Sequence, residues 1–168
     1  ALGCGTRKDC DPDNLRYERI IIMTDADVDG AHIATLLMTL FFQEMPEMVR
    51  QGHLYLARPP LYRLTAGGKS VYAQDEKERT EIENGIFKGK KVEVGRFKGL
   101  GEMNPSQLKE TTMDPETRSL FRVTLPHEYE DRASVKDLVT RLMGKQPEHR
   151  FDFIQANAAS LDEEAIDA

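Results

Sequence analysis

The sequence of 168 residues has no tryptophan, only two cysteines and no apolar run long enough to cross a bilayer. Its longest apolar stretch, at residues 33–42, is interrupted by two threonines and is much shorter than the ~20 residues that a membrane-spanning helix needs. The chain opens with neither an initiator methionine nor a basic segment followed by an apolar run. We therefore expect no secretory signal and a start within a longer protein.

The two cysteines and the shortage of positive charge further narrow the classes of protein to which this chain could belong. Cys4 and Cys10 lack the paired spacing of a zinc site, which predicts free thiols in a reducing compartment such as the cytosol. Asp and Glu number 29 against 23 Lys and Arg, giving a net charge of -6. Because a protein that coats nucleic acid needs clustered Lys and Arg, any DNA contact is expected to be local.

The order of apolar and polar residues predicts an α/β fold. Residues 19–23 have the β-branched composition of a buried parallel strand, and a helix follows from Gly30. This helix is apolar nearly all round, so we expect it to be buried. Residues 53–57 form the next predicted strand and complete a strand, helix, strand unit. The later expected elements are a hairpin, a charged helix, a strand and a glycine-rich basic loop, at residues 62–73, 75–83, 92–94 and 96–101.

The last third of the sequence predicts helices. Asn-Pro at 104–105 and Asp-Pro at 114–115 each place a capping side chain before proline, so each is expected to open a short helix. Ser134 begins a capping-box pattern ahead of a helix that should end at Gly144. A final helix is expected from about Pro147, followed by an acidic tail that frays.

Three carboxylates alternate along the loop that leaves the first predicted strand: Asp25, Asp27 and Asp29. In open α/β sheets, ligands bind in the crevice at the carboxyl ends of the strands. Adjacent carboxylates repel one another, and a divalent cation removes that cost by neutralising them. Ligation by oxygen alone favours Mg²⁺ over zinc, with Mn²⁺ or Ca²⁺ able to substitute. The loop therefore predicts a divalent metal site.

Other interpretations of this loop fit less well or stay open. An EF-hand has Asp, Asp, Asp and Gly at these positions, but it needs a glutamate at the position of Leu36 and a preceding helix. Capping of the next helix explains one aspartate better than three. An aspartyl-phosphate phosphatase, with Asp25 as nucleophile and Asp27 as acid/base, remains compatible with the loop alone.

Longer motifs resemble a known family. Residues 22–33, Ile-Met-Thr-Asp-Ala-Asp-Val-Asp-Gly-Ala-His-Ile, look like the Asp-rich motif of the TOPRIM domain in bacterial type IIA DNA topoisomerases. Arg-Pro-Pro-Leu-Tyr at 58–62, the block at 96–105 and Thr-Thr-Met-Asp-Pro at 111–115 resemble later parts of the B subunit. The likeness covers nearly the whole chain and makes the phosphatase a remote alternative.

The resemblance implies a TOPRIM-type parallel sheet flanked by helices over residues 1–100, truncated at its first strand, and a mostly helical C-terminal tail over 101–168. The family's first metal ligand is a glutamate in a Glu-Gly-Asp-Ser-Ala block, which is missing here and is expected upstream of Ala1. The short segment from Lys69 to Arg96, and Phe97 after it, are similar to the topoisomerase IV branch (ParE) rather than to gyrase.

By the same resemblance, Asp25 shares one Mg²⁺ with the absent glutamate, while Asp27 and Asp29 serve a second position. Asp25 and Asp27 are thereby implied to be catalytic. The implied DNA contacts are Lys98, His32 and Arg96. The family works in the cytoplasm, at the nucleoid, as an A2B2 heterotetramer with a ParC-like A subunit that carries the DNA-cleaving tyrosine. ATP is used by the full-length B subunit through a domain not recognised here, so this chain alone is expected to be inactive, or to serve only as an assembly module.

Overall fold

The computed structural model describes residues 1–126 and 129–158, so the predicted fraying of the acidic tail lies outside the described residues. By their contacts the residues form two units. Unit 1 comprises Ala1–Ile20, His32–Leu54 and Arg122–Ala168, and unit 2 comprises Ile21–Ala31 and Tyr55–Phe121. None of the helices in the described ranges combines the length and apolarity that a membrane span requires.

The first three-stranded sheet contains the predicted strand, helix, strand unit. Its strands are β1 (Ile20–Ile22), β2 (Leu54–Ala57) and β6 (Leu120–Arg122), in the order β1-β2-β6. Helix α1 (Val28–Glu44) connects β1 to β2 in the sequence. The mixture of small sheets and helices confirms the expected α/β class.

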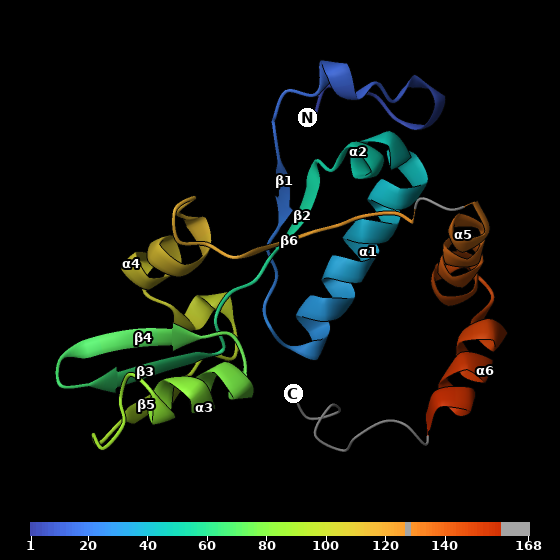
Figure 1. Cartoon of the computed structure of the whole chain (residues 1–168). Coiled ribbons are helices and arrows are strands. Elements are labelled where there is room, and N and C mark those ends of the chain that lie inside the picture. Colours follow the sequence, from blue (N-terminus) through green and yellow to red (C-terminus); the bar gives the residue numbers. More distant parts are fainter. Residues whose placement is uncertain (127–128, 159–168) are drawn as a thin grey trace. The chain divides into compact units, whose positions relative to one another are not determined.

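Unit 2 is built around an antiparallel sheet with the order β4-β3-β5, formed by β3 (Tyr62–Ala66), β4 (Lys69–Ala73) and β5 (Glu93–Arg96) (Figure 1). The β3–β4 turn is Gly67-Gly68, and both residues have the positive φ that a two-residue hairpin needs. Helix α3 (Glu76–Asn84) packs against β4, and its N-cap Asp75 accepts a hydrogen bond from the Glu78 N–H at 2.9 Å. The core of this unit contains Leu64, Ala66, Ala73, Ile82 and Phe87.

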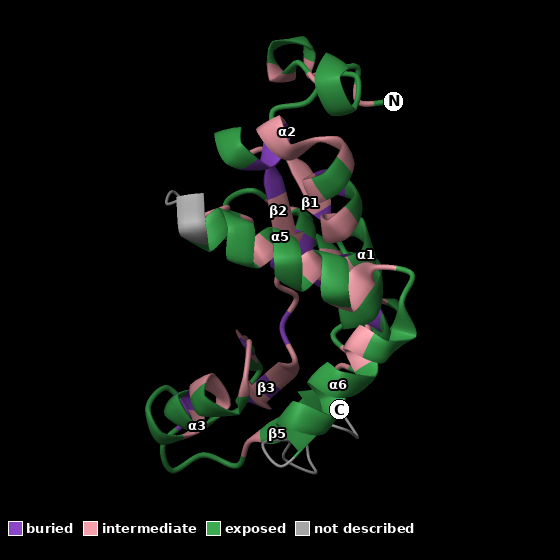
Figure 2. Ribbon diagram, turned by 90° about the vertical axis from the view of Figure 1, so that its right-hand side faces the viewer, coloured by how far each residue is buried: buried purple, intermediate pink, exposed green. Residues whose placement is uncertain are grey.

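Unit 1 combines an N-terminal leader with helices. The leader contains two short 3-10 helices, η1 (Arg7–Asp9) and η2 (Pro12–Asn14). Helix α2 (Pro46–Gln51) ends at Gly52, which has the left-handed conformation typical of a helix C-cap. The C-terminal helices are α5 (Tyr129–Met143) and α6 (Pro147–Asn157), and Figure 2 shows α6 exposed over most of its surface.

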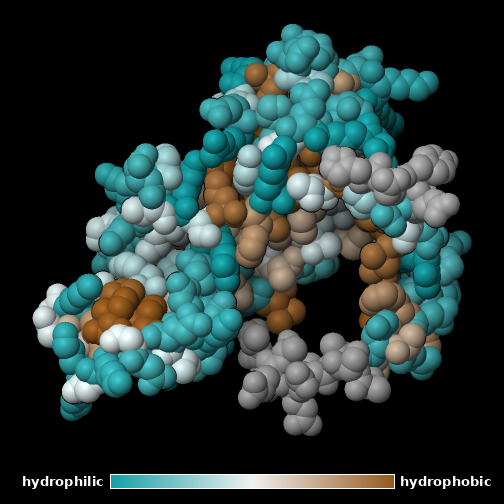
Figure 3. All heavy atoms as spheres, viewed as in Figure 1, coloured by the Kyte–Doolittle hydropathy of each residue, from teal (hydrophilic) through white to brown (hydrophobic). Residues whose placement is uncertain are grey.

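The prediction that α1 is a buried helix was wrong. Ala34 and Phe41 are buried, but three large apolar residues are about half exposed: Ile33 at 51%, Leu36 at 49% and Leu40 at 47%. Figure 3 shows hydrophobic residues at the surface over this helix. An apolar pattern all round a helix shows which side chains it is able to bury. Within the described residues, however, the elements that pack on α1 cover only part of its circumference.

Two predicted helix starts were also wrong. The segment after Asp114 is a turn, because the Asp114 carboxylate accepts the Glu116 N–H at 3.0 Å and thus offers the backbone an alternative to a helix. Ser134 lies inside α5, which begins at Tyr129. A Ser-x-x-Asp spacing also describes two neighbours on one helical face, so it does not by itself mark an end. By contrast, Asn104 forms the capping box that opens α4 (Pro105–Leu108), as predicted, and η3 (Leu100–Glu102) and the π-helical turn η4 (Lys109–Met113) flank it.

Candidate functional site

Two loops that are far apart in the sequence meet in unit 2. We call residues 24–30 the aspartate loop and residues 96–102 the basic loop. Oδ1 of Asp25 accepts a hydrogen bond from the backbone N–H of Leu100 at 2.7 Å, across 75 residues of sequence. The Asp25 side chain lies on the exposed surface just after β1. The structure therefore brings together two motifs that the sequence presents separately.

Gly99 permits this contact. A β-carbon placed on Gly99 would lie 2.8 Å from both Cγ and Oδ1 of Asp25, and 3.1 Å from Oδ2. Real β-carbons essentially never approach to such a distance, so any larger residue here must displace the carboxylate or the loop. Gly101, two residues later, has nothing within 4 Å of the same hypothetical atom. The close approach of the Asp25 side chain thus leaves room for glycine at position 99, and a larger residue would make the carboxylate move.

Gly30 fixes the other side of the aspartate loop. A β-carbon at this buried position would lie 2.1 Å from the backbone oxygen of Asp25. The backbone of Asp25 therefore folds directly over the first turn of α1. Close backbone approach is therefore the physical reason why glycine suits this position at the start of the helix.

Asp27 caps helix α1. Its Oδ1 accepts the Gly30 N–H at 2.7 Å, and its backbone oxygen accepts the Ala31 N–H at 3.0 Å. This is the geometry of an N-cap, which satisfies amide groups that the first helical turn leaves without partners. Asp29 is exposed within the first turn, where the helix dipole favours negative charge. The capping interpretation therefore applies to Asp27 rather than to all three residues.

The basic loop is held by its own backbone and by a carboxylate. The Phe97 N–H donates to the Leu61 oxygen at 2.8 Å, which ties the loop to the sheet of unit 2. The Lys98 N–H donates to Oε2 of Glu102 at 2.8 Å, while the Lys98 side chain is exposed. Glu102 is a member of the site that the sequence motifs did not indicate, because its role depends on the three-dimensional turn of the loop.

The other predicted DNA contacts lie in different places. Arg96 is exposed at the end of β5, in register with Tyr62 of β3, and leads directly into the basic loop. His32 is exposed on α1, and its contacts group it with unit 1 rather than with the two loops. The role of each in DNA contact remains a prediction.

The residues of the two loops meet some of the requirements of a metal-binding site. Across residues 1–126 and 129–158, no three His, Cys, Asp or Glu side chains are grouped so that they could hold a metal ion. The Asp25 side chain is nevertheless exposed, and its hydrogen bond to the Leu100 N–H orients it. Its two carboxylate oxygens are both possible metal ligands. A carboxylate has about four lone-pair sites, so one accepted N–H leaves capacity for a hard cation. The assignment of Asp25, Asp27 and Asp29 as metal ligands remains a prediction.

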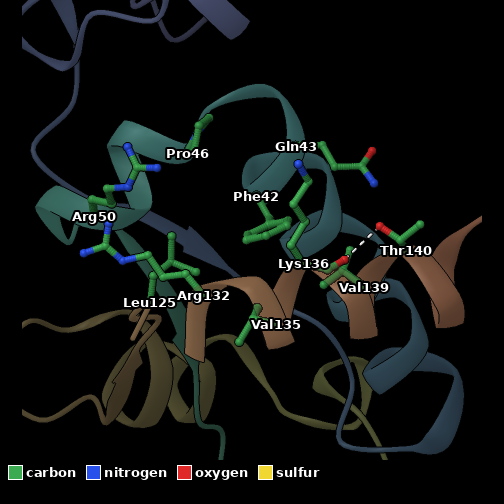
Figure 4. Close-up of a pocket in the computed structure, with 10 residues that line it drawn as sticks. All are labelled: Phe42, Gln43, Pro46, Arg50, Leu125, Arg132, Val135, Lys136, Val139 and Thr140. Carbon is green, nitrogen blue, oxygen red and sulfur yellow. Dashed lines mark hydrogen bonds between the residues drawn. The ribbon is translucent and has the colours of Figure 1, made fainter. Parts of the chain in front are cut away.

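A separate cavity lies in unit 1, among α1, α2 and α5 (Figure 4). Its volume is about 410 Å³, and apolar side chains such as Phe42, Val135 and Val139 line it together with cationic residues. None of the predicted metal or DNA residues contributes to its lining. We therefore treat it as distinct from the two-loop site.

Comparison with known protein families finds two matches to separate parts of this chain. Residues 5–59 match the Toprim domain, and residues 89–155 match the carboxyl terminus of the DNA gyrase B subunit. The boundary predicted near residue 100 remains a prediction.

Curated relatives align with nearly the whole chain. The B subunit of DNA topoisomerase 4 from Caulobacter vibrioides is 63% identical over 158 residues, which are 94% of this chain and 22% of that protein. The corresponding protein of Rickettsia felis is 61% identical, with 94% of this chain and 24% of the relative covered. The DNA gyrase B subunit of Thermotoga maritima is 49% identical, with 97% and 25% covered. The chain thus spans about a quarter of the length of these relatives.

Proposed function

Because this chain is recognised, over most of its length, as the Toprim and C-terminal region of a bacterial type IIA DNA topoisomerase B subunit, we propose that it supplies carboxylate ligands for Mg²⁺ at a DNA-cleavage site. The observation that carries the proposal is the hydrogen bond from the Leu100 N–H to Asp25. It fixes an exposed carboxylate beside a loop that carries basic side chains. Such a pairing would suit a divalent cation that acts on a phosphate group.

Each residue has a definite part in this proposal. Asp25 would be the principal ligand, oriented through its Oδ1 by the basic loop. Asp27 and Asp29 would complete the negative surface, with one oxygen of Asp27 engaged in capping α1. Lys98 and Arg96 would contact DNA phosphates, which fix position without reading sequence. Mn²⁺ or Ca²⁺ would occupy the same carboxylates.

When held by these carboxylates, Mg²⁺ would supply Lewis-acid stabilisation of the negative charge that develops in phosphoryl transfer. The chain's own contribution is positional. Glu102 holds the basic loop through the Lys98 N–H, and Gly99 lets that loop lie against Asp25. Preorganised charges of this kind lower a barrier because they need no rearrangement during the reaction. His32 is assigned a contact with DNA rather than a proton transfer.

The topoisomerase IV branch is the more strongly supported identity for the whole protein. Its relatives share a larger fraction of residues with this chain than the gyrase relative does. The proposed activity is ATP-dependent strand passage, with DNA relaxation and decatenation during chromosome segregation. The proposed assembly is an A2B2 heterotetramer with a ParC-like A subunit, in the cytoplasm at the nucleoid. The B subunit of DNA gyrase, which would introduce negative supercoils, is the alternative.

One observation favours a second candidate function. In the part of the chain that the structure describes, no three side chains are grouped so that they could hold a metal ion. If Asp25 also bound no metal, this region would serve only as an assembly module. The same Asp25–Leu100 bond would then be a structural link between two loops. The two candidates differ in what the Asp25 carboxylate does beyond accepting that one hydrogen bond.

The test uses a full-length B subunit that contains this region, combined with its A subunit. We expect Mg²⁺-dependent relaxation and decatenation, and a fall in DNA cleavage of at least ~100-fold for Asp25→Asn, in line with loss of one electrostatic group in the transition state. Glu116→Gln, which changes an exposed carboxylate that belongs to neither loop, is the matched control. Normal cleavage by Asp25→Asn would support the assembly module. Net negative supercoiling would assign the chain to gyrase.

A further inference from the structure

Two sulfur atoms are in contact in unit 1, and a second cysteine lies beside one of them. The Cys4 thiol lies 3.3 Å from the thioether sulfur of Met48, and both side chains are almost fully buried, at 1% and 0% exposure. Cys4 and Cys10 are both free cysteines. The sulfurs come from the leader and from α2, and Cys4 and Met48 are 44 residues apart in the sequence.

Cys10 turns toward the same pair. The Asp11 N–H donates to the Cys4 oxygen at 2.7 Å, which closes the leader into a loop and brings Cys10 beside Cys4. The pKa of the Cys10 thiol is raised, chiefly by burial and also by the charge of Cys4 and a hydrogen bond between the two side chains. The Met48 backbone also hydrogen-bonds Cys10 and acts in the opposite direction. Unlike Cys4, Cys10 is only partly buried, so it provides access from solvent.

The loop that carries the thiols is tightly built. Gly3 and Gly5 both have positive φ, at 90° and 75°. A β-carbon on Gly5 would lie 2.3 Å from the Asp9 oxygen, so the loop closes on itself at that residue. The Arg16 N–H donates to the Leu2 oxygen at 2.9 Å and holds the ends of the leader together. The backbone geometry of this loop therefore fixes where Cys4 and Cys10 lie.

Packing and disulfide formation each explain only part of this arrangement. A buried cysteine against a methionine is ordinary core packing, but packing alone does not require a second, partly exposed thiol on the same atoms. A Cys4–Cys10 disulfide would use the two thiols and leave the Met48 thioether as a packing group only.

We propose that Cys4, Cys10 and Met48 form a binding site for one soft monovalent cation of the Cu(I) or Ag(I) class, held by two thiolates and one thioether. Soft sulfur ligands select such ions. Binding displaces one proton from each thiol to solvent, and the metal forms bonds to the two thiolates and to the thioether sulfur. Zn²⁺ fits less well, because it requires four ligands and the nearby Asp11 carboxylate already accepts hydrogen bonds from Asp13 and Asn14.

The test is an anaerobic titration of the reduced full chain with Cu(I), in competition with a coloured Cu(I) chelator, and in parallel with Ag(I), which is not reoxidised. We expect one ion per chain and an ultraviolet thiolate-to-copper band. Cys10→Ser should weaken binding at least ~100-fold, and Met48→Leu, which conserves volume, about tenfold. Met113→Leu, exposed in unit 2, is the matched control and should bind like the wild type.

Folding is checked separately, because Cys4→Ser places a hydroxyl in the core. Circular dichroism of each variant and the rise in Tm caused by Ag(I) in the wild type show whether a folded site binds the ion. Equal affinity of the wild type and Cys10→Ser would overturn the proposal. So would a wild-type chain that loses two hydrogens by mass on exposure to hydrogen peroxide, with two water molecules formed overall, yet binds neither ion when reduced, since the pair would then be a disulfide site only.

Discussion

The two units use apolar residues in different ways. In unit 2, Leu64 and Phe87 are almost completely buried in the core between the antiparallel sheet and α3. In unit 1, α1 carries equally apolar residues, yet Leu36 and Leu40 remain about half exposed. The same hydrophobic pattern therefore leads to a closed core in one unit and to an open helix face in the other.

The difference shows which unit supports the candidate site. The Asp25–Leu100 bond, Gly99 and the anchoring of Phe97 on Leu61 all belong to unit 2. The position of the Asp25 carboxylate thus depends on the core of unit 2, whose apolar side chains are buried by other described residues. The open face of α1 has no part in that support.

The largest expected effect is a difference in the free energy of unfolding between two Leu→Ala substitutions, one in each unit. Leu64→Ala removes a fully buried side chain and should lower the free energy of unfolding by about 2–5 kcal/mol. Leu36→Ala removes a side chain that is 49% exposed on a helix, where alanine is favourable, and should change it by less than about 1 kcal/mol. Urea unfolding of both variants measures the difference. Similar losses would mean that α1 is covered in solution.

The second prediction concerns two glycines of the basic loop. Gly99→Ala should displace the Asp25 carboxylate and weaken Mn²⁺ binding by at least ~10-fold, which corresponds to about 1.4 kcal/mol. Gly101→Ala meets no atom within 4 Å and should leave the affinity unchanged. Electron paramagnetic resonance of Mn²⁺ titrated into the full chain provides the measurement. Unchanged binding in Gly99→Ala would separate the metal from the basic loop.

The third prediction separates the aspartates of one loop. Asp27→Ala removes the cap of α1 and should destabilise the chain by about 1 kcal/mol in the absence of metal. Asp29→Ala loses only an interaction with the helix dipole and should cost no more than about 0.3–1 kcal/mol. Thermal unfolding in a chelating buffer checks the order. The reverse order would contradict the assignment of Asp27 as the cap.

The smallest expected effect comes from an exposed ion pair. Arg7 of the leader contacts Glu44 of α1, and that hydrogen bond holds the pKa of the Glu44 carboxyl below its usual value of 4.5. The pKa of Glu44 is lower in the folded state than in the unfolded state. The ion pair therefore stabilises the folded chain fully above the unfolded-state pKa, and this stabilisation disappears as the pH falls through the folded-state pKa. The Tm of Glu44→Gln should lie slightly below that of the wild type at pH 7 and converge with it as the pH falls through the folded pKa. A constant gap would exclude this pair as the cause.

Local features were predictable from the sequence, and contacts between distant segments were not. The charged helix predicted at residues 75–83 and the helix start predicted at Asn104 depend on neighbours within a few residues of sequence. The exposure of α1 depends on which surfaces are available to cover it. The bond between Asp25 and Leu100 spans 75 residues, and the role of Glu102 depends on the turn of its loop. Family resemblance marked both loops as functional without giving the contact between them.

The central claim is that the Asp25 carboxylate, positioned by the basic loop, binds the metal used for DNA cleavage. The most direct measurement replaces oxygen by sulfur at this position and compares metals, with Asp25→Cys in a full-length B subunit assembled with its A subunit. Because thiolates prefer softer ions, we expect cleavage to be lost with Mg²⁺ and largely restored when Mn²⁺ or Cd²⁺ is supplied, relative to the wild type in the same ions. An equal loss with every metal, or no loss with Mg²⁺, would contradict the claim.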